Sequence, residues 1–205
     1  MKLYMTPGSC STGIHILLEE LDLPFEVYLV DLLAGDQNRP DYLAMNPKGT
    51  IPTLVRDDGS VLTEFQAIAW WLARTHPKAK LLPDDAEGEA RVIEAMTYAV
   101  GTIHTQGFAR IFTMAHFTPN AAEHEAVKQR GLEIVAKGYA VLDALLNGRE
   151  YVAGRFSIAD AALFYVEFWG DKLKLELPEN CLAHYRRMLA RPAVQRVLRE
   201  EGYRV

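Results

Sequence analysis

The sequence predicts an α/β domain with a mixed β-sheet, followed by a domain built only of helices. Short strand patterns and helix patterns alternate through residues 1–80, whereas only helical patterns follow residue 88. Segment 81–85 reads Leu-Leu-Pro-Asp-Asp, which is typical of a linker. We therefore expect a first domain at 1–80, a linker at 81–88 and an all-helical domain at 89–205.

The first domain reads as a β-α-β unit followed by a β-β-α unit. Its expected elements are, in order, a strand at 2–5, a helix at 10–21, a strand at 25–30, a loop with a short helix after residue 35, strands at 53–55 and 60–62, and a helix that Thr63 caps. A helix connects the first two strands, so these strands should be parallel. Residues 56–59 end in Asp-Gly, which is typical of an antiparallel hairpin turn. The two kinds of connection make the sheet mixed.

The second domain contains five helical segments. They are expected at 87–112, 121–146, 157–169, 182–189 and 192–201. Ser157-Ile158-Ala159-Asp160 has the form of an N-terminal capping box ahead of an apolar run, with Asp in place of the usual Glu. We interpret this segment as structural.

Composition and charge exclude several classes of function. Hydrophobic residues make up 49% of the 205 and charged residues 24%, which is typical of a globular protein. The net charge is −5 without a basic cluster, which argues against nucleic acid as a partner. No apolar run approaches the roughly 20 residues of a membrane span. Pro7-Gly8 interrupts the N-terminus too early for a signal peptide, so we expect a cytoplasmic protein that does not bind a membrane.

Cysteine usage and metal motifs agree with that location. Cys10 and Cys181 lie far apart in the sequence, and a reducing compartment fits them better than a disulfide does. No group of His, Cys, Asp or Glu has the spacing of a zinc site, and no glycine-rich phosphate loop is present. We therefore expect no metal cofactor.

Cys10 is the residue whose position most clearly indicates a chemical role, because it lies where the first helix is expected to begin. Unpaired N–H groups and the helix dipole favour an anion there by about 1–2 kcal/mol. An ordinary thiol has a pKa of about 8.5, and about 1.36 kcal/mol corresponds to one pKa unit. The position therefore predicts that Cys10 approaches half ionisation near neutral pH, or that it stabilises the thiolate of a bound thiol. A small buried apolar side chain is the alternative interpretation.

Three further residues carry a structural and a functional interpretation. His15 lies five positions after Cys10 and points about 140° away from it, so it cannot activate the thiol and is interpreted as a hydrogen-bonded structural histidine. Pro52 lacks a backbone donor and suits the start of a strand. Glu64 lies in the first turn of its helix, where it is either a capping carboxylate or a ligand for an ammonium group.

Together these residues resemble a bacterial beta-class cytosolic glutathione transferase over nearly the whole chain. The resemblance rests on four segments in the right order, namely Met1 to Tyr4 with Pro7 to Ser11, Asn46 to Pro52, Leu62 to Glu64 with Ala67-Ile68, and Gly154 to Ala161. It implies a thioredoxin-like first domain with a four-stranded sheet, an α-helical second domain and a homodimer.

The resemblance also implies which residues bind glutathione, the co-substrate. Cys10, with Ser11 beside it, would face the glutathione sulfur as the catalytic residues. Ile51 would pair its backbone with the cysteinyl unit, held by a cis Pro52, and Glu64 and the backbone of Phe65 would hold the γ-glutamyl end. The pocket for a hydrophobic electrophile would be lined by Met5, His104, Thr105, Phe108, Ile111, Phe112 and Phe168.

Four positions depart from the family pattern. Met5 stands where many relatives have a tyrosine, and residues 34–36 read Ala-Gly-Asp where beta-class members offer a lysine. Phe65 replaces a Ser or Gly, and Thr105-Gln106 replaces a His-Lys pair. These departures weaken the case for a standard conjugating enzyme and for tight glutathione binding.

Two classes of function remain open on the sequence. The leading hypothesis is a glutathione transferase, which transfers glutathione to a hydrophobic electrophile or performs thiol transfer through Cys10. The alternative is a non-catalytic, glutathione-transferase-like binding or regulatory protein. A glutaredoxin-like oxidoreductase is disfavoured by the long helical domain.

Overall fold

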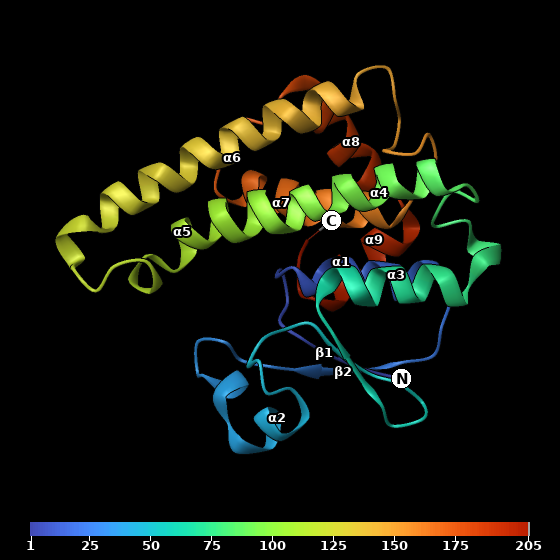
Figure 1. Cartoon of the computed structure of the whole chain (residues 1–205), viewed down its shortest axis with the longest axis horizontal. Helices are drawn as coiled ribbons and strands as arrows, with labels where there is room; N and C mark the ends of the chain where they lie inside the picture. Colours follow the sequence, from blue (N-terminus) through green and yellow to red (C-terminus); the bar gives the residue numbers. More distant parts are fainter. Residues whose placement is uncertain (205) are drawn as a thin grey trace. The chain divides into compact units, whose positions relative to one another are not determined.

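The structure is a computed structural model that describes residues 1–204 of the chain. The chain folds into two compact units (Figure 1). The first unit consists of Met1–Leu82 together with the chain from Arg187 onward, and the second unit is Pro83–Arg186. No helix among the described residues is long and apolar enough to cross a lipid bilayer.

The first unit contains a four-stranded mixed sheet. Its strands are β1 (Lys2–Met5), β2 (Glu26–Leu29), β3 (Thr53–Val55) and β4 (Val61–Thr63), arranged in the order β2-β1-β3-β4. β1 pairs parallel with β2, and β3 pairs antiparallel with both β1 and β4. Side chains alternate across β1, so that Leu3 and Met5 are fully buried on one face while Tyr4 lies on the other. The predicted thioredoxin-like mixed sheet is confirmed.

Helices of the first unit are α1 (Ser11–Glu20), α2 (Pro40–Met45), α3 (Phe65–Thr75) and α9 (Pro192–Glu200), with short 3₁₀ turns η1 (Asp36–Asn38) and η2 (Pro77–Ala79). α1 packs against α3, α9 and β1. α3 buries Phe65, Ile68, Ala69 and Leu72, which is the stripe that the helical spacing predicts. Gly59, with φ +81°, closes the hairpin between β3 and β4, where the Asp-Gly pair predicted it.

The start of α3 differs from the prediction. Thr63 is the last residue of β4 instead of a helix cap, and Glu64 occupies the N-cap position without a side-chain bond to the helix. Glu64 has φ +72° and ψ +129°, a left-handed conformation that side-chain-bearing residues rarely adopt. The capping interpretation of the Glu64 carboxylate is therefore wrong.

The second unit is all-helical. Its elements are α4 (Ala86–Tyr98), the π-helix η3 (Ala99–Phe108), α5 (Ala109–Phe112), the 3₁₀ turns η4 (Met114–His116) and η5 (Ala121–Glu123), α6 (His124–Leu146) and α7 (Ile158–Lys172). α8 (Glu179–Leu189) runs from this unit into the first. The α4-η3-α5 run and α6 lie side by side and antiparallel (Figure 1). The predicted single helix at 87–112 is thus one continuous run with a π-helical middle.

α7 is buried along almost its entire length, and its N-terminus is the predicted capping box. The Asp160 carboxylate accepts hydrogen bonds from the backbone N–H and the hydroxyl of Ser157, both at 2.7 Å. It also accepts one from the N–H of Val152 at 2.9 Å, which ties the preceding loop to the helix. The structural interpretation of this segment is confirmed.

The end of the chain packs differently from the expected domain at 89–205. α9 belongs to the first unit, because Arg191 and Arg196 bind Glu20 and Glu19 of α1. Helical periodicity identifies α9 but does not say which neighbour it packs on.

Candidate functional site

Cys10 precedes α1 at its N-cap position and is 8% exposed. Its thiol donates a long hydrogen bond to the carbonyl oxygen of Ile51, with the sulfur 3.7 Å from the oxygen. The Ile51–Pro52 peptide bond is cis, as the family resemblance implies. The turn before α1 and the segment before β3 therefore bring Cys10, Ile51 and Pro52 together.

The protonation state of Cys10 differs from the prediction. Burial raises the pKa of Cys10 to about 12, the backbone N–H groups of Cys10 and Ser11 act in the opposite direction, and the Glu64 carboxylate adds to the rise. The helix start therefore does not compensate for the loss of water around the sulfur. The expectation of a half-ionised Cys10 near neutral pH is wrong, and the thiol is protonated.

Ser11 is the first residue of α1 and is fully buried. Its hydroxyl lies 2.5 Å from that of Ser9 and accepts a hydrogen bond from the N–H of Thr6 at 3.2 Å. These contacts fix the turn that presents Cys10. In this geometry Ser11 supports the loop, and its hydroxyl is already engaged.

Glu64 lies on the same unit as Cys10, with its carboxylate half-exposed. It accepts a hydrogen bond from the ammonium group of Lys48 at 2.7 Å, and Lys48 also donates to the Thr63 hydroxyl at 2.9 Å. From the sequence, Lys48 was identified only within the segment Asn46 to Pro52, one of the four that carry the family resemblance. Phe65 is buried in the apolar face of α3, so at this position only its backbone is available to a ligand.

Aromatic residues gather in the second unit around Trp169 of α7. The rings of His104, Phe108 and Phe112 lie 4.8, 5.2 and 5.3 Å from the Trp169 ring, measured between centroids. Phe112 is 46% exposed, whereas Phe108 is fully buried. The resemblance supplied the first three residues and missed Trp169. The sequence contained a signal for Trp169, because it directly follows Phe168 in an expected helix. Adjacent helical side chains point about 100° apart, so Phe168 and Trp169 face different neighbours and both are candidates for the pocket.

Four other residues of the expected electrophile pocket have different surroundings. Phe168 packs on Phe164, with 6.0 Å between the ring centroids. Thr105 is exposed, and its hydroxyl donates to the carbonyl of Val100 at 2.7 Å within the π-helix. Ile111 is buried in α5. Met5 is fully buried in β1 of the first unit.

His104 is neutral in this environment. Burial lowers the pKa of His104 to about 4. Its Nδ1 lies 3.2 Å from the hydroxyl of Tyr165, and its ring packs edge-on against the Tyr165 ring. The ring is therefore an uncharged member of the aromatic cluster around Trp169.

His15 is engaged as predicted. Its Nδ1 lies 3.0 Å from the Glu201 carboxylate, and the ring packs edge-on against Phe25 at 5.5 Å. The predicted hydrogen bonding of His15 is confirmed at Nδ1.

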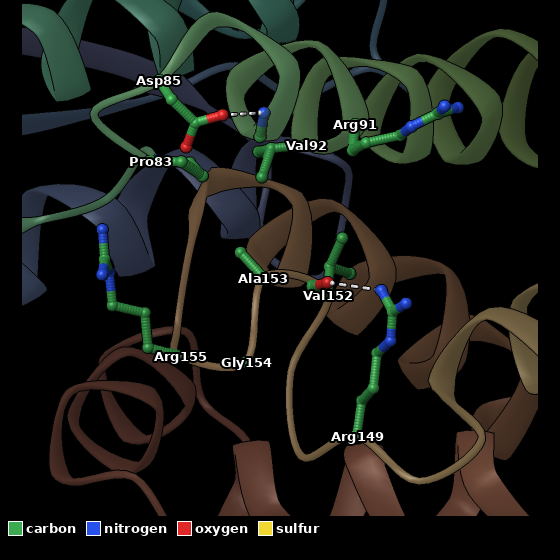
Figure 2. Close-up of a pocket in the computed structure, with 10 residues that line it drawn as sticks. Pro83, Asp85, Arg91, Val92, Arg149, Val152, Ala153, Gly154 and Arg155 are labelled. Atoms are coloured by element: carbon green, nitrogen blue, oxygen red, sulfur yellow. Dashed lines mark hydrogen bonds between the residues drawn. The ribbon is translucent and has the colours of Figure 1, made fainter.

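The second unit also contains a cavity of about 530 Å³ between the start of α4 and the loop before α7 (Figure 2). Asp85 caps α4 on one side by accepting the N–H of Gly88 at 2.8 Å. Arg149, on the opposite side, donates to the carbonyl of Val152 at 3.4 Å (Figure 2). None of the site residues expected from the sequence lines this cavity.

Comparison with known proteins identifies the family. The glutathione S-transferase N-terminal domain family matches residues 8–75, and the C-terminal domain family matches residues 102–192. Glutathione S-transferase GstA of Escherichia coli O157:H7 is 38% identical over 207 residues, covering 98% of this chain and 99% of that protein. A Sulfitobacter glutathione transferase homologue solved with bound glutathione superposes with a TM-score of 0.90 at 32% identity over 97% of both chains. A beta-class enzyme of Sphingomonas chungbukensis gives 0.85 at 32% identity over 98% and 99% of the two chains. The chain therefore belongs to the glutathione S-transferase family of enzymes, as the sequence predicted.

Proposed function

We propose that this glutathione S-transferase is of the beta-class type and binds glutathione on its first unit. The glutathione sulfur lies at Cys10, the cysteinyl backbone pairs with Ile51 beside Pro52, and the γ-glutamyl end lies at Glu64 and the backbone of Phe65. The 32% identity to the beta-class enzyme of Sphingomonas chungbukensis, over nearly both whole chains, supports the class.

The contact between Cys10 and Ile51 carries this proposal. The protonated Cys10 thiol donates to the Ile51 carbonyl at 3.7 Å. When glutathione binds beside Ile51, the same S–H group can donate to the glutathione thiolate instead. Hydrogen bonds to a charged group contribute about 1.5–3 kcal/mol, although a thiol is a weak donor and lies at the low end. About 1.4 kcal/mol would lower the pKa of bound glutathione by one unit.

Conjugation is the reaction that this chemistry favours. The glutathione thiolate, held by the Cys10 S–H, attacks an apolar electrophile, forms a carbon–sulfur bond and displaces the leaving group. The exposed face of Phe112 in the aromatic cluster suits a hydrophobic electrophile. Met5, Thr105 and Phe168 stay predictions for this pocket.

Thiol transfer through Cys10 is the second reaction. The Cys10 thiolate attacks the glutathione sulfur of a mixed disulfide, forms a Cys10–glutathione disulfide and releases the other thiol as thiolate. A second glutathione thiolate then attacks that disulfide, releases oxidised glutathione and restores Cys10. This route first needs deprotonation of a thiol whose pKa burial raises to about 12, so it should be the slower one.

Calorimetric titration with reduced glutathione tests the site, on the wild-type protein and on the Cys10→Ala variant. Both proteins should bind glutathione between micromolar and millimolar concentrations. The variant should lose thiol transfer completely and should retain part of the conjugation of an aryl halide. Unchanged thiol transfer would contradict the role of Cys10. Absence of binding and of turnover in the wild type would contradict the enzyme and favour a binding or regulatory protein.

A cytoplasmic location and a homodimer are part of the same proposal. Cys10 and Cys181 are both free and buried, which agrees with a reducing compartment. Light scattering on a gel-filtration column should give twice the 23.0 kDa of one chain, and a monomeric mass would contradict the dimer.

A further inference from the structure

Three side chains of the first unit, other than those proposed to bind glutathione, form a cluster. His15 and Glu19 are four residues apart and lie on one face of α1, and Glu200 ends α9, which packs against α1. One ring nitrogen of His15 and one carboxylate oxygen from each glutamate all lie within 4.8 Å of one another. A tetrahedral zinc ion separates its nitrogen and oxygen ligands by about 3.4 Å, so small side-chain movements suffice.

The orientation of the His15 ring is set by Glu201. The Nδ1 of His15 lies 3.0 Å from Oε1 of Glu201. The other oxygen, Oε2, accepts hydrogen bonds from the Gly8 N–H and the Thr12 hydroxyl, both at 2.7 Å. A carboxylate with these donors acts as an acceptor toward the ring, so Nδ1 carries the proton. The Nε2 of His15 then presents a lone pair on the side away from Glu201.

The environment of Nε2 is unusual for a buried nitrogen. His15 is 1% exposed, and its Nε2 forms no hydrogen bond with any described residue, although Oε2 of Glu200 lies only 3.2 Å away. In the neutral imidazole, Nε2 and this carboxylate oxygen both present lone pairs, which repel each other at that distance. A cation bound by both atoms would remove the repulsion and would satisfy the buried nitrogen.

The charges around the cluster leave room for a divalent cation. Four carboxylates line the contact between α1 and α9, at Glu19, Glu20, Glu200 and Glu201. Arg191 pairs with Glu20 at 2.7 Å and Arg196 with Glu19 at 2.8 Å. Neither Glu200 nor Glu201 has an arginine or lysine partner within residues 1–204. Among residues 1–204 only His15 pairs with these two carboxylates, so a neutral imidazole leaves two negative charges uncompensated.

We propose that His15, Glu19 and Glu200 bind one Zn²⁺ ion between α1 and α9. Imidazole and carboxylate are both zinc ligands, and three protein ligands leave a fourth position for water. Glu201 holds the coordinating imidazole through Nδ1, which is the usual arrangement behind a metal-bound histidine. The half-exposed Glu200 and a neighbouring cavity of about 260 Å³, which His15 and Glu200 help to line, give the ion access.

Zinc titration of the untagged full chain, freed of metal with a chelator, tests the proposal. We expect one Zn²⁺ per chain by calorimetry, and a Co²⁺ complex whose absorbance reports four or five ligands. Glu200→Gln removes an exposed ligand without disturbing the core and should weaken zinc binding at least about tenfold. Glu19→Gln should do the same.

Glu20→Gln is the matched control. It removes the same charge from α1 without removing a ligand, so the zinc affinity should stay at the wild-type value. Absence of a one-to-one site in the wild type would overturn the proposal, as would equal affinities of the wild type, Glu200→Gln and Glu19→Gln. Loss of zinc binding in Cys10→Ala would place the ion at the thiol and would also overturn it.

Discussion

The sulfur of Cys10 lies 3.7 Å from the carbonyl oxygen of Ile51, a position from which a protonated thiol donates a hydrogen bond. Only the S–H form can donate to a carbonyl oxygen. Burial raises the pKa of Cys10 to about 12, so the hydrogen bond and the titration behaviour agree. The Cys10 S–H group is therefore better suited to donate a hydrogen bond to the thiolate of a bound ligand than to lose its own proton.

Slow alkylation of Cys10 follows from this protonation state. At pH 8 a thiol with a pKa of about 8.5 is roughly one-quarter thiolate, whereas a pKa of about 12 leaves about one part in ten thousand. Iodoacetamide should therefore modify Cys10 at least about a hundredfold more slowly in the folded protein than in guanidinium. Mass spectrometry of the Cys10 peptide measures the rate separately from Cys181. A folded-state rate that levels off below pH 9 would contradict the buried, protonated thiol.

Replacement of Glu64 by Gln should weaken glutathione binding with little effect on stability. Glu64 pairs with Lys48 at 2.7 Å on an exposed surface, and such pairs contribute about 0–1 kcal/mol. A hydrogen bond to the charged γ-glutamyl ammonium is stronger, at about 1.5–3 kcal/mol, so KM for glutathione should rise roughly tenfold or more. Gln keeps the Cβ at φ +72°, so the variant isolates the charge.

Steady-state kinetics against glutathione and urea unfolding together check this prediction. Glu26→Gln is the matched control, because Glu26 is an exposed carboxylate of the same unit that binds the Tyr28 hydroxyl at 2.7 Å. It should leave KM unchanged. A Glu64→Gln enzyme with the wild-type KM would place the γ-glutamyl end elsewhere.

The charge on His184 of the second unit should make the free energy of unfolding fall as the pH becomes alkaline. Burial acts to lower the pKa of His184, but Glu167 at 2.8 Å and Asp160 at 3.2 Å outweigh it and raise the pKa to about 10. The folded value exceeds the unfolded value of about 6.5. The stabilising contribution is therefore complete below pH 6.5 and is lost as the pH rises toward 10.

His184→Gln measures that contribution by urea unfolding between pH 6.5 and 10. The variant leaves buried carboxylates without their cation, which should cost about 3–5 kcal/mol at pH 6.5. The difference from the wild type should shrink steadily toward pH 10. His104→Gln is the control, because burial lowers the pKa of His104 to about 4 and this ring stays neutral over the whole range. A pH-independent cost of His184→Gln would contradict a charged His184.

Local signals predicted the fold and part of the site. The strand predicted at 2–5 is β1, and the Ser157–Asp160 spacing predicted a capping box that the structure contains. These features depend on residues within one element or one turn, so their physics can be read from a short window of sequence. The position of Cys10 at the start of α1 belongs to the same class.

Features that depend on distant neighbours were missed. Helix position alone predicted a Cys10 that approaches half ionisation near neutral pH, but burial of the sulfur raises its pKa to about 12. Trp169 joins His104 only because α7 and η3 pack together. The spacing of apolar residues identified α9 as a helix but did not show that Glu201, just beyond it, reaches Thr12.

Glycine substitutions in the second unit should show how tightly η3 and α6 pack. A Cβ on Gly131 of α6 would lie 2.8 Å from the backbone oxygen of Gly107, which cannot move without bending η3. Gly131→Ala should therefore lower the free energy of unfolding by about 1–3 kcal/mol. A Cβ on Gly101 of η3 meets nothing within 4 Å, so Gly101→Ala should raise it by up to about 1 kcal/mol. Urea unfolding of both variants is the measurement. Equal shifts would mean that helix propensity alone controls these positions, whereas opposite signs would show that the close approach of the two backbones requires Gly131.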